Sequence, residues 1–339
     1  MERTLASVET IKNLKSIDGA DFIEIATFED LGWQCVVKKG EFTEGDKSVY
    51  FSIDSILPEK SWCEFLGNSK RLKTKKFKGA LSQGLALPLS IFELNEELLN
   101  LSQGEDVTEL LGVSKYEPPM HFQAGNAKGN FPSYLGFSKT DETRIQAVPS
   151  ALNELHGQPY KITEKADGTS GTFLVIDGVF TVCSRNLMLK EDDTTVYWVA
   201  AHRYDLKNKM VTEEFKHYVI QGEVVGPSIQ GNKLGLSAID LFVFNVFDLN
   251  ELRYLDADAE EKVIERLGLK AVKTIEKGEC FDYDLEGILA LAEGKYDRTK
   301  NEREGIVIRS QKQMYSERLH GRMSFKAISN KFLLKNPEE

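Results

Sequence analysis

Residues 163–172 read TEKADGTSGT, and the rest of the chain can be understood from this stretch outward. It lies between two apolar runs, KIT before it and FLVI after it, which are typical of strands. Lys165 therefore stands where the chain turns between two buried elements, with Asp167 and Gly168 directly behind it. A solvated loop lysine has no need of such a setting, whereas a lysine that reacts with a substrate does. The pattern makes Lys165 the first candidate functional residue.

Length and composition predict an ordinary globular protein with two domains. The chain has 339 residues, of which 41% are hydrophobic and 28% charged, and this length exceeds what one core usually holds. No apolar run approaches the length of a membrane span, and the charged N-terminal residues do not resemble a signal peptide. The four cysteines are far apart and form no paired motif. We therefore expect reduced thiols, no membrane, and a cytoplasmic location, or a nuclear one in a eukaryote.

The distribution of charge limits the contact with nucleic acid to local patches. A net charge of -10 argues against a protein that coats DNA. Two basic stretches stand out against this background. Residues 70–78 read KRLKTKKFK and include Phe77, and residues 305–335 contain seven Lys or Arg against one acid, Glu317. Either stretch is a candidate contact for a polyanion, and the alternative for each is a solvated face.

The first third of the chain predicts a small β-barrel. Short alternating or apolar runs, FIEIATFE, WQCVVKK, SVYFSID and QGLALPLSIF, are separated by turn signals. About five short strands in fewer than 100 residues favour an OB-fold. We assign residues 1–115 to an OB-like module that binds nucleic acid. Residues 116–138 are rich in Pro, Gly and Asn without periodicity, and we interpret them as a linker.

Residues 139–339 predict a second, mixed domain. A hairpin is expected to turn at Asp177-Gly178, and helices are expected in TTVYWVAAHRYDLKNKM and over residues 256–267. Strand patterns follow one another without regular helical crossovers. The fold class is therefore α+β, in which an OB-like barrel precedes a domain of antiparallel sheets flanked by helices.

Several classes of active site can be excluded because their sequence motifs are absent. The sequence contains no P-loop, no G-x-G-x-x-G after a strand and no G-x-S-x-G elbow. What remains is Lys165 together with carboxylates at strand ends, Asp167, Glu223 and Glu304. Three carboxylates would raise the pKa of a lysine that must be neutral to attack. This conflict disappears if the carboxylates hold a divalent cation, which favours the neutral amine and neutralises a phosphate.

The ordered set of motifs resembles the covalent nucleotidyltransferases, the superfamily of ATP-dependent ligases and mRNA capping enzymes. Lys165 to Gly168 is similar to the K-x-D-G motif, and the five further motifs follow in the family's order: Ser184-Arg185-Asn186, Gly222-Glu223, Phe242 to Asn245, Glu304 to Val307 and Ser324-Phe325-Lys326. K-x-D-G alone is a weak match. The whole set in this order over about 160 residues is a strong one.

Within this superfamily the chain resembles the nick-sealing RNA ligases that carry an N-terminal OB domain. DNA ligases generally have arginine five positions after the nucleophile, where this chain has Ser170, and only 13 residues follow Lys326, too few for a C-terminal OB domain. The phrase KTDETRIQ at 139–146 is also similar to that branch. Two positions depart from the pattern. Ser324 replaces the first lysine of K-x-K, which leaves Lys326, helped by Lys331, and Asn245 stands where aspartate is common.

The resemblance implies an activity and a set of residue roles. Lys165 would take AMP from ATP, pass it to a 5′-phosphate end, and a 3′-OH would then displace it. The implied partner is RNA, or a duplex containing RNA with a nick, and the protein would act as a monomer with Mg²⁺ or Mn²⁺. The implied catalytic residues are Lys165, Asp167, Arg185, Glu223, Glu304 and Lys326. The implied nucleotide contacts are Glu164, Lys165, Gly168, Arg185, Glu223, Phe244, Glu304 and Lys326, and the implied metal ligands are Asp167, Glu223 and Glu304.

Three alternatives stay open at this point. A nucleic-acid-binding protein with an inert second domain would bind RNA without forming an adduct. A capping-type enzyme would form its adduct from GTP. An enzyme with a pyridoxal phosphate Schiff base on Lys165 would absorb near the visible, and the motif set argues against it.

Overall fold

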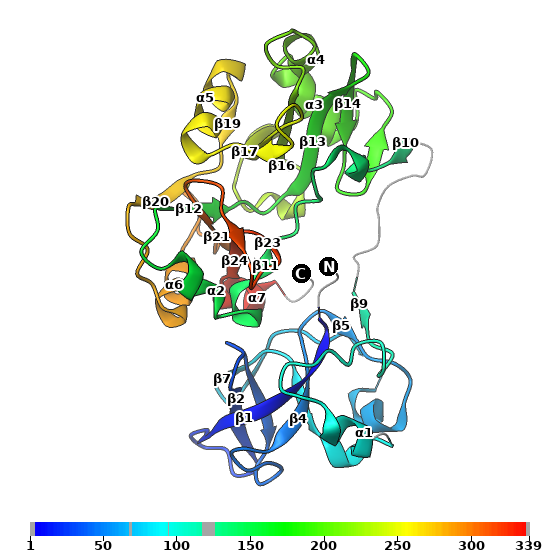
Figure 1. Ribbon diagram of the computed structural model, residues 1–339, viewed down its shortest axis with the longest axis vertical. Coiled ribbons are helices and arrows are strands. Elements are labelled where there is room, and N and C mark those ends of the chain that lie inside the picture. Colours follow the sequence, from blue (N-terminus) through cyan, green and yellow to red (C-terminus); the bar gives the residue numbers. More distant parts are fainter. Residues whose placement is uncertain (1–3, 68–69, 94, 117–125, 337–339) are drawn as a thin grey trace. The chain divides into compact units, whose positions relative to one another are not determined.

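The computed structural model describes residues 4–67, 70–93, 95–116 and 126–336 (Figure 1). The chain divides into two compact units. Unit 1 contains residues 1–119, 145–150 and 333–339, and unit 2 contains residues 120–144 and 151–332. Within the described ranges, no helix has the length and apolarity needed to cross a membrane.

Unit 1 is built on a five-stranded antiparallel sheet in the order β3-β2-β1-β4-β8. The strands are β1 (Ala6–Ser16), β2 (Ile23–Phe28), β3 (Gln34–Lys38), β4 (Lys47–Phe51) and β8 (Leu85–Pro88). Residues 6–10 of β1 pair with β4 and residues 11–16 with β2, and a bulge between Ile11 and Asn13 lies at the start of the part that pairs with β2. Because a bulge bends a strand, the sheet curls, and a hydrogen bond from Gln83 N, just before β8, to Gln34 O of β3 links its two edges. This is the expected OB-like barrel.

The remaining elements of unit 1 are short and lie in the connections. They are β5 (Ser55–Ile56), η1 (Ser61–Leu66), β6 (Lys75–Phe77), β7 (Ala80–Ser82), η2 (Leu89–Ile91), α1 (Asn95–Asn100) and β9 (Ser114–Lys115). β6 pairs with β7 as a small hairpin between β4 and β8, and β5 pairs with β9. The connection between β4 and β8 is one of the loops that OB-folds use to bind nucleic acid, and it carries the basic stretch.

Unit 2 contains two antiparallel-rich sheets, of which the first carries the larger core. Its strands run in the order β10-β15-β14-β13-β16-β17-β18, with β19 beside β17. They are β10 (Ala127–Asn130), β13 (Thr169–Ile176), β14 (Val179–Cys183), β15 (Leu187–Leu189), β16 (Tyr218–Val225), β17 (Asp240–Asp248), β18 (Arg253–Tyr254) and β19 (Lys270–Ala271). Apolar side chains of these strands pack with α3 (Val196–Arg203), α4 (Leu206–Met210) and α5 (Ala257–Leu267).

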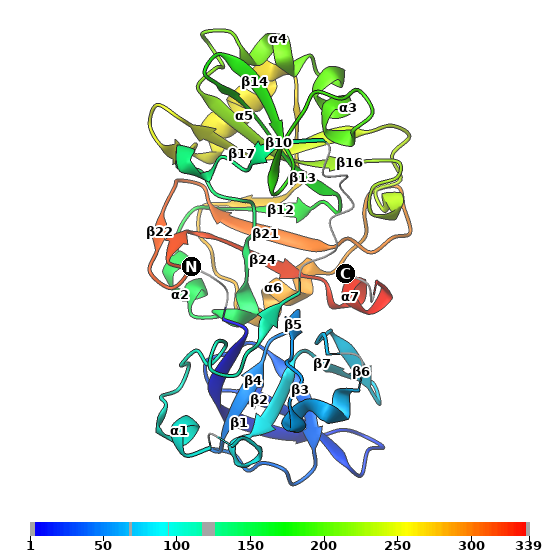
Figure 2. The ribbon, with the colours of Figure 1, turned by 90° about the vertical axis from the view of Figure 1, so that its right-hand side faces the viewer.

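The second sheet of unit 2 has the order β11-β24-β21-β12-β20. Its strands are β11 (Thr143–Arg144), β12 (Tyr160–Lys165), β20 (Thr274–Gly278), β21 (Gly305–Ser310) and β24 (Ser324–Ile328), with the pair β22 (Tyr315–Ser316) and β23 (Gly321–Arg322) beyond them. Figure 2 shows β12, β21 and β24 next to the first sheet, with α2 (Ala151–Leu155) and α6 (Leu285–Ala292) on their other side. The remaining elements are η4 (Ser133–Leu135), η5 (Ile145–Ala147), η6 (Gln230–Asn232) and α7 (Asn330–Lys335).

The structure differs from the sequence prediction in the second half of the expected linker, residues 116–138. Residues 117–125 of that segment lie outside the described residues. Residues 127–138 belong to unit 2, where β10 pairs with β15, and Phe131 and Phe137 are buried against the first sheet. Its Pro, Gly and Asn content conceals this role, since contacts with distant parts of unit 2, and no periodic pattern of its own, hold it in place.

Candidate active site

Lys165 is placed by the junction between the two sheets of unit 2. It is the last residue of β12, and the turn Ala166-Asp167-Gly168 carries the chain into β13 of the other sheet. Pairing of β12 with β21 sets Lys165 opposite Gly305, next to Glu304. Pairing of β13 with β16 sets Ser170 opposite Glu223. Strand register alone therefore brings the two distant glutamates to the lysine.

The turn requires glycine at position 168. A Cβ atom there would overlap the carbonyl oxygen of Val224 and the side chain of Glu223. The backbone of the K-x-D-G turn therefore lies directly on β16. Any larger residue would push the turn away from the strand that carries Glu223.

The lysine is tightly paired in this structure. Lys165 Nζ donates a hydrogen bond of 2.7 Å to Glu304 Oε2, and both side chains are largely buried. Burial disfavours the charged amine, but the carboxylates of Glu304, Glu223 and Asp167 outweigh it and raise the pKa of Lys165 above its usual range. Burial also raises the pKa of Glu223 to about 8, although Lys165 opposes this change. The conflict predicted from the sequence is thus present, and attack by Lys165 needs a further source of positive charge.

The three carboxylates surround the lysine without forming a closed set of metal ligands. Within the described ranges, no group of three or more His, Cys, Asp or Glu side chains gathers closely enough to hold a metal ion. Glu304 contacts Lys165, and Asp167 Oδ2 lies 2.8 Å from Lys233 Nζ. An all-oxygen, strongly negative site suits a hard divalent cation that keeps some of its water. The residues therefore fit a hydrated Mg²⁺ or Mn²⁺ better than one stripped of water.

Two residues that contact the Lys165–Asp167 turn were not found from the sequence. Lys233, which contacts Asp167, follows a loop in which Ser228, Gln230 and Asn232 all have positive φ. Three non-glycine residues in this conformation within five positions mark a strained segment, which is typical of functional sites. A lysine in a polar loop carries no sequence signal of its own.

Tyr296 is the second residue that sequence reasoning missed. Its hydroxyl donates to the carbonyl oxygen of Lys165 at 2.9 Å and accepts from the backbone N–H of Glu304 at 3.1 Å. The side chain is 2% exposed. One tyrosine therefore ties the backbone of the lysine to the backbone of its glutamate partner, although it lies in a segment, GKYDRTK, that reads as an ordinary loop.

Arg185 and Lys326 meet through a third residue. Asp141 Oδ2 accepts from Arg185 Nη2 at 3.0 Å, and Asp141 Oδ1 accepts from Lys326 Nζ at 3.2 Å. Burial lowers the pKa of Lys326, and Asp141 opposes that change. The structure thus brings both predicted cations to one carboxylate. Lys331 does not join them, because its amine lies 3.7 Å from Glu293 Oε2.

Glu164 is separated from the other predicted residues. It precedes Lys165 on β12, and neighbouring strand residues point to opposite faces. Burial raises the pKa of Glu164, and the charged groups that act on it are Lys273, Arg303 and Asp297, none of which is among those that act on Lys165. Its carboxylate therefore does not belong to the cluster around the lysine.

Phe244, the candidate adenine contact, is half-buried on β17 and is held by an arginine network. Arg309 Nη1 donates to Phe244 O at 2.6 Å and its Nε donates to Ser324 Oγ at 2.9 Å. Arg322 Nη1 donates to Asn245 Oδ1 at 2.6 Å. The two positions that depart from the family pattern, Ser324 and Asn245, are thus both hydrogen-bonded to arginines.

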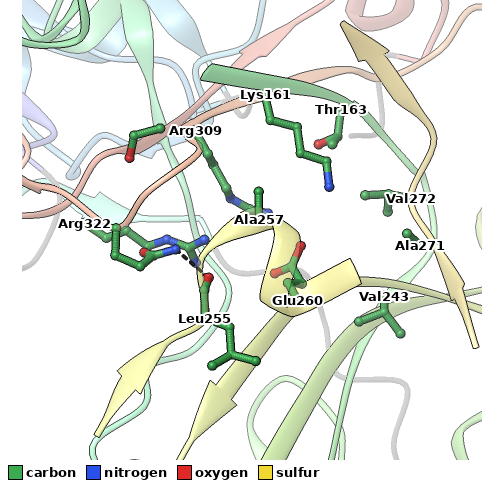
Figure 3. Close-up of a pocket in the computed structure, with 12 residues that line it drawn as sticks. Lys161, Thr163, Val243, Leu255, Ala257, Glu260, Ala271, Val272, Arg309 and Arg322 are labelled. Carbon is green, nitrogen blue, oxygen red and sulfur yellow. Dashed lines mark hydrogen bonds between the residues drawn. The ribbon is translucent and has the colours of Figure 1, made fainter. Parts of the chain in front are cut away.

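The arginine network borders a small cavity, shown in Figure 3 with Lys161, Arg309, Arg322 and Glu260 around it. Its volume is about 20 Å³, which admits a water molecule but no substrate. Burial raises the pKa of Glu260, and the nearby cations oppose this change. The cavity is therefore part of the polar support behind Phe244.

Comparison with known proteins assigns the family. A sequence model described as RNA ligase matches residues 158–328, and one described as an OB-fold domain matches residues 5–89. The chain belongs to the RNA ligase family. A search of curated proteins found no match.

Solved structures of an RNA ligase from Naegleria gruberi extend the family match over the whole chain. One, a mutant with AMP and manganese, has a TM-score of 0.87 at 35% identity and covers 99% of this chain and 100% of its own. A second, with pyrophosphate, has a TM-score of 0.86 at 35% identity over 100% of both chains. A third, a mutant with ATP and manganese, has a TM-score of 0.87 at 35% identity, covering 99% and 100%. RNA ligases join RNA ends. The comparisons therefore confirm the predicted enzyme class and the RNA substrate, and they argue against a capping enzyme and against a protein that only binds RNA.

Proposed function

We propose that this chain is an ATP-dependent RNA ligase that joins a 3′-OH end to a 5′-phosphate end through an AMP adduct on Lys165. The observation that carries this proposal is the position of Lys165, at the junction of two sheets and in contact with Glu304, with Glu223 and Asp167 within electrostatic range. The relatives solved with ATP, AMP, pyrophosphate and manganese support the choice of nucleotide and metal.

The neutral amine of Lys165 attacks the α-phosphorus of ATP. A bond from Nζ to phosphorus forms, the bond to the pyrophosphate oxygen breaks, and the amine loses its proton. The 5′-phosphate of an RNA end then attacks the same phosphorus and frees Lys165. In the last step a 3′-OH attacks the 5′-phosphate and AMP leaves. A divalent cation supplies positive charge that favours the neutral amine and offsets charge on the phosphates.

The remaining residues hold the reacting groups. Glu304 positions the amine of Lys165. Asp167, Glu223 and Glu304 would hold the water of a hydrated cation when one is bound, and Glu223 would also hold a ribose hydroxyl. Arg185 and Lys326 stabilise the negative charge on the phosphate that is transferred. Glu164 is left out of this assignment, because its carboxylate lies among a different set of charges.

The nucleotide base has its own contacts. Phe244 offers a half-exposed ring for adenine stacking.

The OB module, residues 1–115, is proposed to hold the RNA beside the nick. Its basic stretch divides into two parts. Arg71 is used internally, since it pairs with Asp54 at 3.0 Å and stacks on Tyr116. The β6–β7 hairpin instead exposes Lys75, Lys76 and Lys78 together with Phe77, and cations with an aromatic ring are what such barrels use on nucleic acid strands.

The test is formation of the covalent adduct. Wild-type protein incubated with ATP and Mg²⁺ or Mn²⁺ is expected to gain one AMP by intact-mass spectrometry, and Lys165→Ala is expected to gain none. Lys277→Ala, a lysine of the neighbouring strand β20 that pairs with Asp258, is the matched control and should label normally. An adduct that persists in Lys165→Ala would place the nucleophile elsewhere, and labelling by GTP in place of ATP would favour a capping-type enzyme.

A further inference from the structure

Asp141 bridges two cations that the proposed function assigns to phosphate. Each of its carboxylate oxygens accepts from one of them, Oδ2 from Arg185 at 3.0 Å and Oδ1 from Lys326 at 3.2 Å. Lys326 is 17% exposed, whereas Asp141 is 42% and Arg185 51% exposed. The bridge is therefore open to solvent on the side of Asp141 and Arg185.

A phosphoryl group can accept the same two hydrogen bonds as the Asp141 carboxylate, and it can accept further ones. It carries at least two terminal oxygens for the two donors, and a monoester carries more charge than a carboxylate, which strengthens hydrogen bonds to cations. Lys326 Nζ carries three N–H donors and Arg185 Nη2 two, so the position of the phosphate decides whether it competes with Asp141. A phosphate that bridges Arg185 and Lys326 from the solvent-open side, through the hydrogens that now point at Asp141, takes the place of its carboxylate.

The segment around Asp141 can release that side chain without leaving its place. Lys139 Nζ donates to Asn186 Oδ1 at 2.7 Å, Thr140 Oγ1 hydrogen-bonds Ser170 Oγ at 2.6 Å, and Glu142 accepts from Arg309 Nη2 at 2.9 Å. The following strand, β11, pairs with β24. Because its neighbours are anchored on both sheets, a change of rotamer at Asp141 is enough to release its carboxylate from the two cations.

We propose that Asp141 is a displaceable substitute for phosphate, which sets the affinity of the Arg185–Lys326 pair for phosphoryl groups. It keeps the two cations together and neutralised until a phosphate arrives, and each ligand binds more weakly because it must first replace the carboxylate. The inference rests on the proposed function of this pair. The phosphate can belong to the nucleotide or to the 5′ end of the RNA, and the two sources are separable.

The experiment compares ligands that differ only in the phosphate. Dissociation constants of AMP and adenosine, and of a short RNA with and without a 5′-phosphate, are measured by calorimetry on wild-type protein and Asp141→Asn. The expected result is roughly three- to tenfold tighter binding of AMP, of the 5′-phosphorylated RNA, or of both, because one or two exposed ion pairs no longer compete. The dissociation constants of adenosine and of 5′-hydroxyl RNA should be unchanged. The ligand that tightens identifies the source of the phosphate.

Asp258→Asn is the matched control, because it removes one negative charge from a residue that pairs with Lys277 in the same unit. It should leave all four constants unchanged. Weaker binding of AMP and of phosphorylated RNA by Asp141→Asn would mean that Asp141 only positions the cations, and unchanged binding would mean that it does not compete; either result overturns the proposal.

Two further measurements guard against a folding defect and against confusion with the proposed function. Asp141→Ser should reproduce the effect, and in wild-type protein a carbodiimide should join Asp141 to Lys326 through an amide that saturating AMP or phosphorylated RNA suppresses. Adduct formation from ATP is measured in parallel. A wild-type protein without adduct would refute the proposed function, whereas normal adduct with unchanged affinities would refute only the role of Asp141.

Discussion

At the scale of single residues, the candidate site depends on backbone as much as on side chains. Lys165 and Glu304 lie 139 positions apart in the chain, and strand pairing together with one tyrosine hydroxyl holds their backbones side by side. Tyr296 satisfies a backbone acceptor on one and a backbone donor on the other. Removing that hydroxyl leaves two buried polar groups without this partner. Tyr296 is therefore a positioning residue for the attack by Lys165.

Tyr296→Phe is expected to slow AMP transfer to Lys165 by roughly tenfold, because a slightly misplaced amine is less often aligned for attack on the α-phosphorus. The KM for ATP should change little, since Tyr296 contacts the backbone and not the nucleotide pocket. Single-turnover labelling at several ATP concentrations separates the two quantities. Tyr283→Phe, which removes a hydroxyl bonded to Glu276, is the control and should keep the wild-type rate. A change in KM alone would argue against positioning.

At the scale of elements, helices and turns specified by the local sequence were predictable, whereas a strand that forms only through tertiary pairing was not. The hairpin at Asp177-Gly178 is confirmed, since both residues have positive φ, which the tight turn between β13 and β14 requires. The predicted helix at 256–267 is confirmed as α5. β10 was missed, because the sequence AKGN has neither alternation nor β-branched residues and becomes a strand only through pairing with β15.

The candidate site shows the same division. The motifs identified Lys165, Glu223 and Glu304, which the structure brings together. Lys165 ends β12 and Glu304 precedes β21, as expected, whereas Glu223 was expected at a strand end and lies within β16. Lys233 and Asp141 were missed as site residues, since nothing in a polar loop indicates which charge it will meet. Glu164 was predicted as a nucleotide contact, and the alternation of strand β12 turns its carboxylate away from the face of Lys165.

Strand β1 contains a buried carboxylate whose titration should be visible in stability. Burial raises the pKa of Glu9 from 4.5 to about 7, against hydrogen bonds from Ser7 and Gln103. Between those pH values the folded state binds more protons than the unfolded state, so stability falls as the pH rises and levels off above pH 7. The loss is about 3 kcal/mol at most.

Glu9→Gln should remove this loss and exceed the wild type in stability at pH 8 but not at pH 4.5. Denaturant unfolding followed by tryptophan fluorescence measures it in a Trp198→Phe background, which leaves Trp33 and Trp62 of unit 1 as reporters. The exposed Glu29, changed to Gln, serves as the control. A constant difference between wild type and Glu9→Gln across the pH range would show that Glu9 does not titrate as described.

At the scale of the whole molecule, the β6–β7 hairpin is a local cluster of exposed cations on an acidic chain. The net charge is -10, yet the β6–β7 hairpin exposes Lys75, Lys76 and Lys78, and Phe77 among them is 41% exposed. Exposed lysines release counterions when they meet phosphates, so their contribution is measurable as salt dependence. Arg71 of the same basic stretch is unsuited to this role, because it is paired with Asp54 and stacked on Tyr116 within the unit.

Reversal of Lys75, Lys76 and Lys78 to Glu is therefore expected to weaken binding of a nicked RNA duplex by about tenfold or more. The slope of log K against log salt should fall by about 2–3, one unit for each lost phosphate contact. Adduct formation from ATP should stay near normal, since all residues assigned to it belong to unit 2. Reversal of Lys12, Lys15 and Lys60, exposed lysines of unit 1 outside the hairpin, gives the same change in net charge. If both triple variants lose affinity equally, net charge and not the hairpin governs binding; if neither does, the RNA lies elsewhere. A loss confined to the hairpin variant, with its adduct intact, would separate recognition of the RNA from chemistry on ATP.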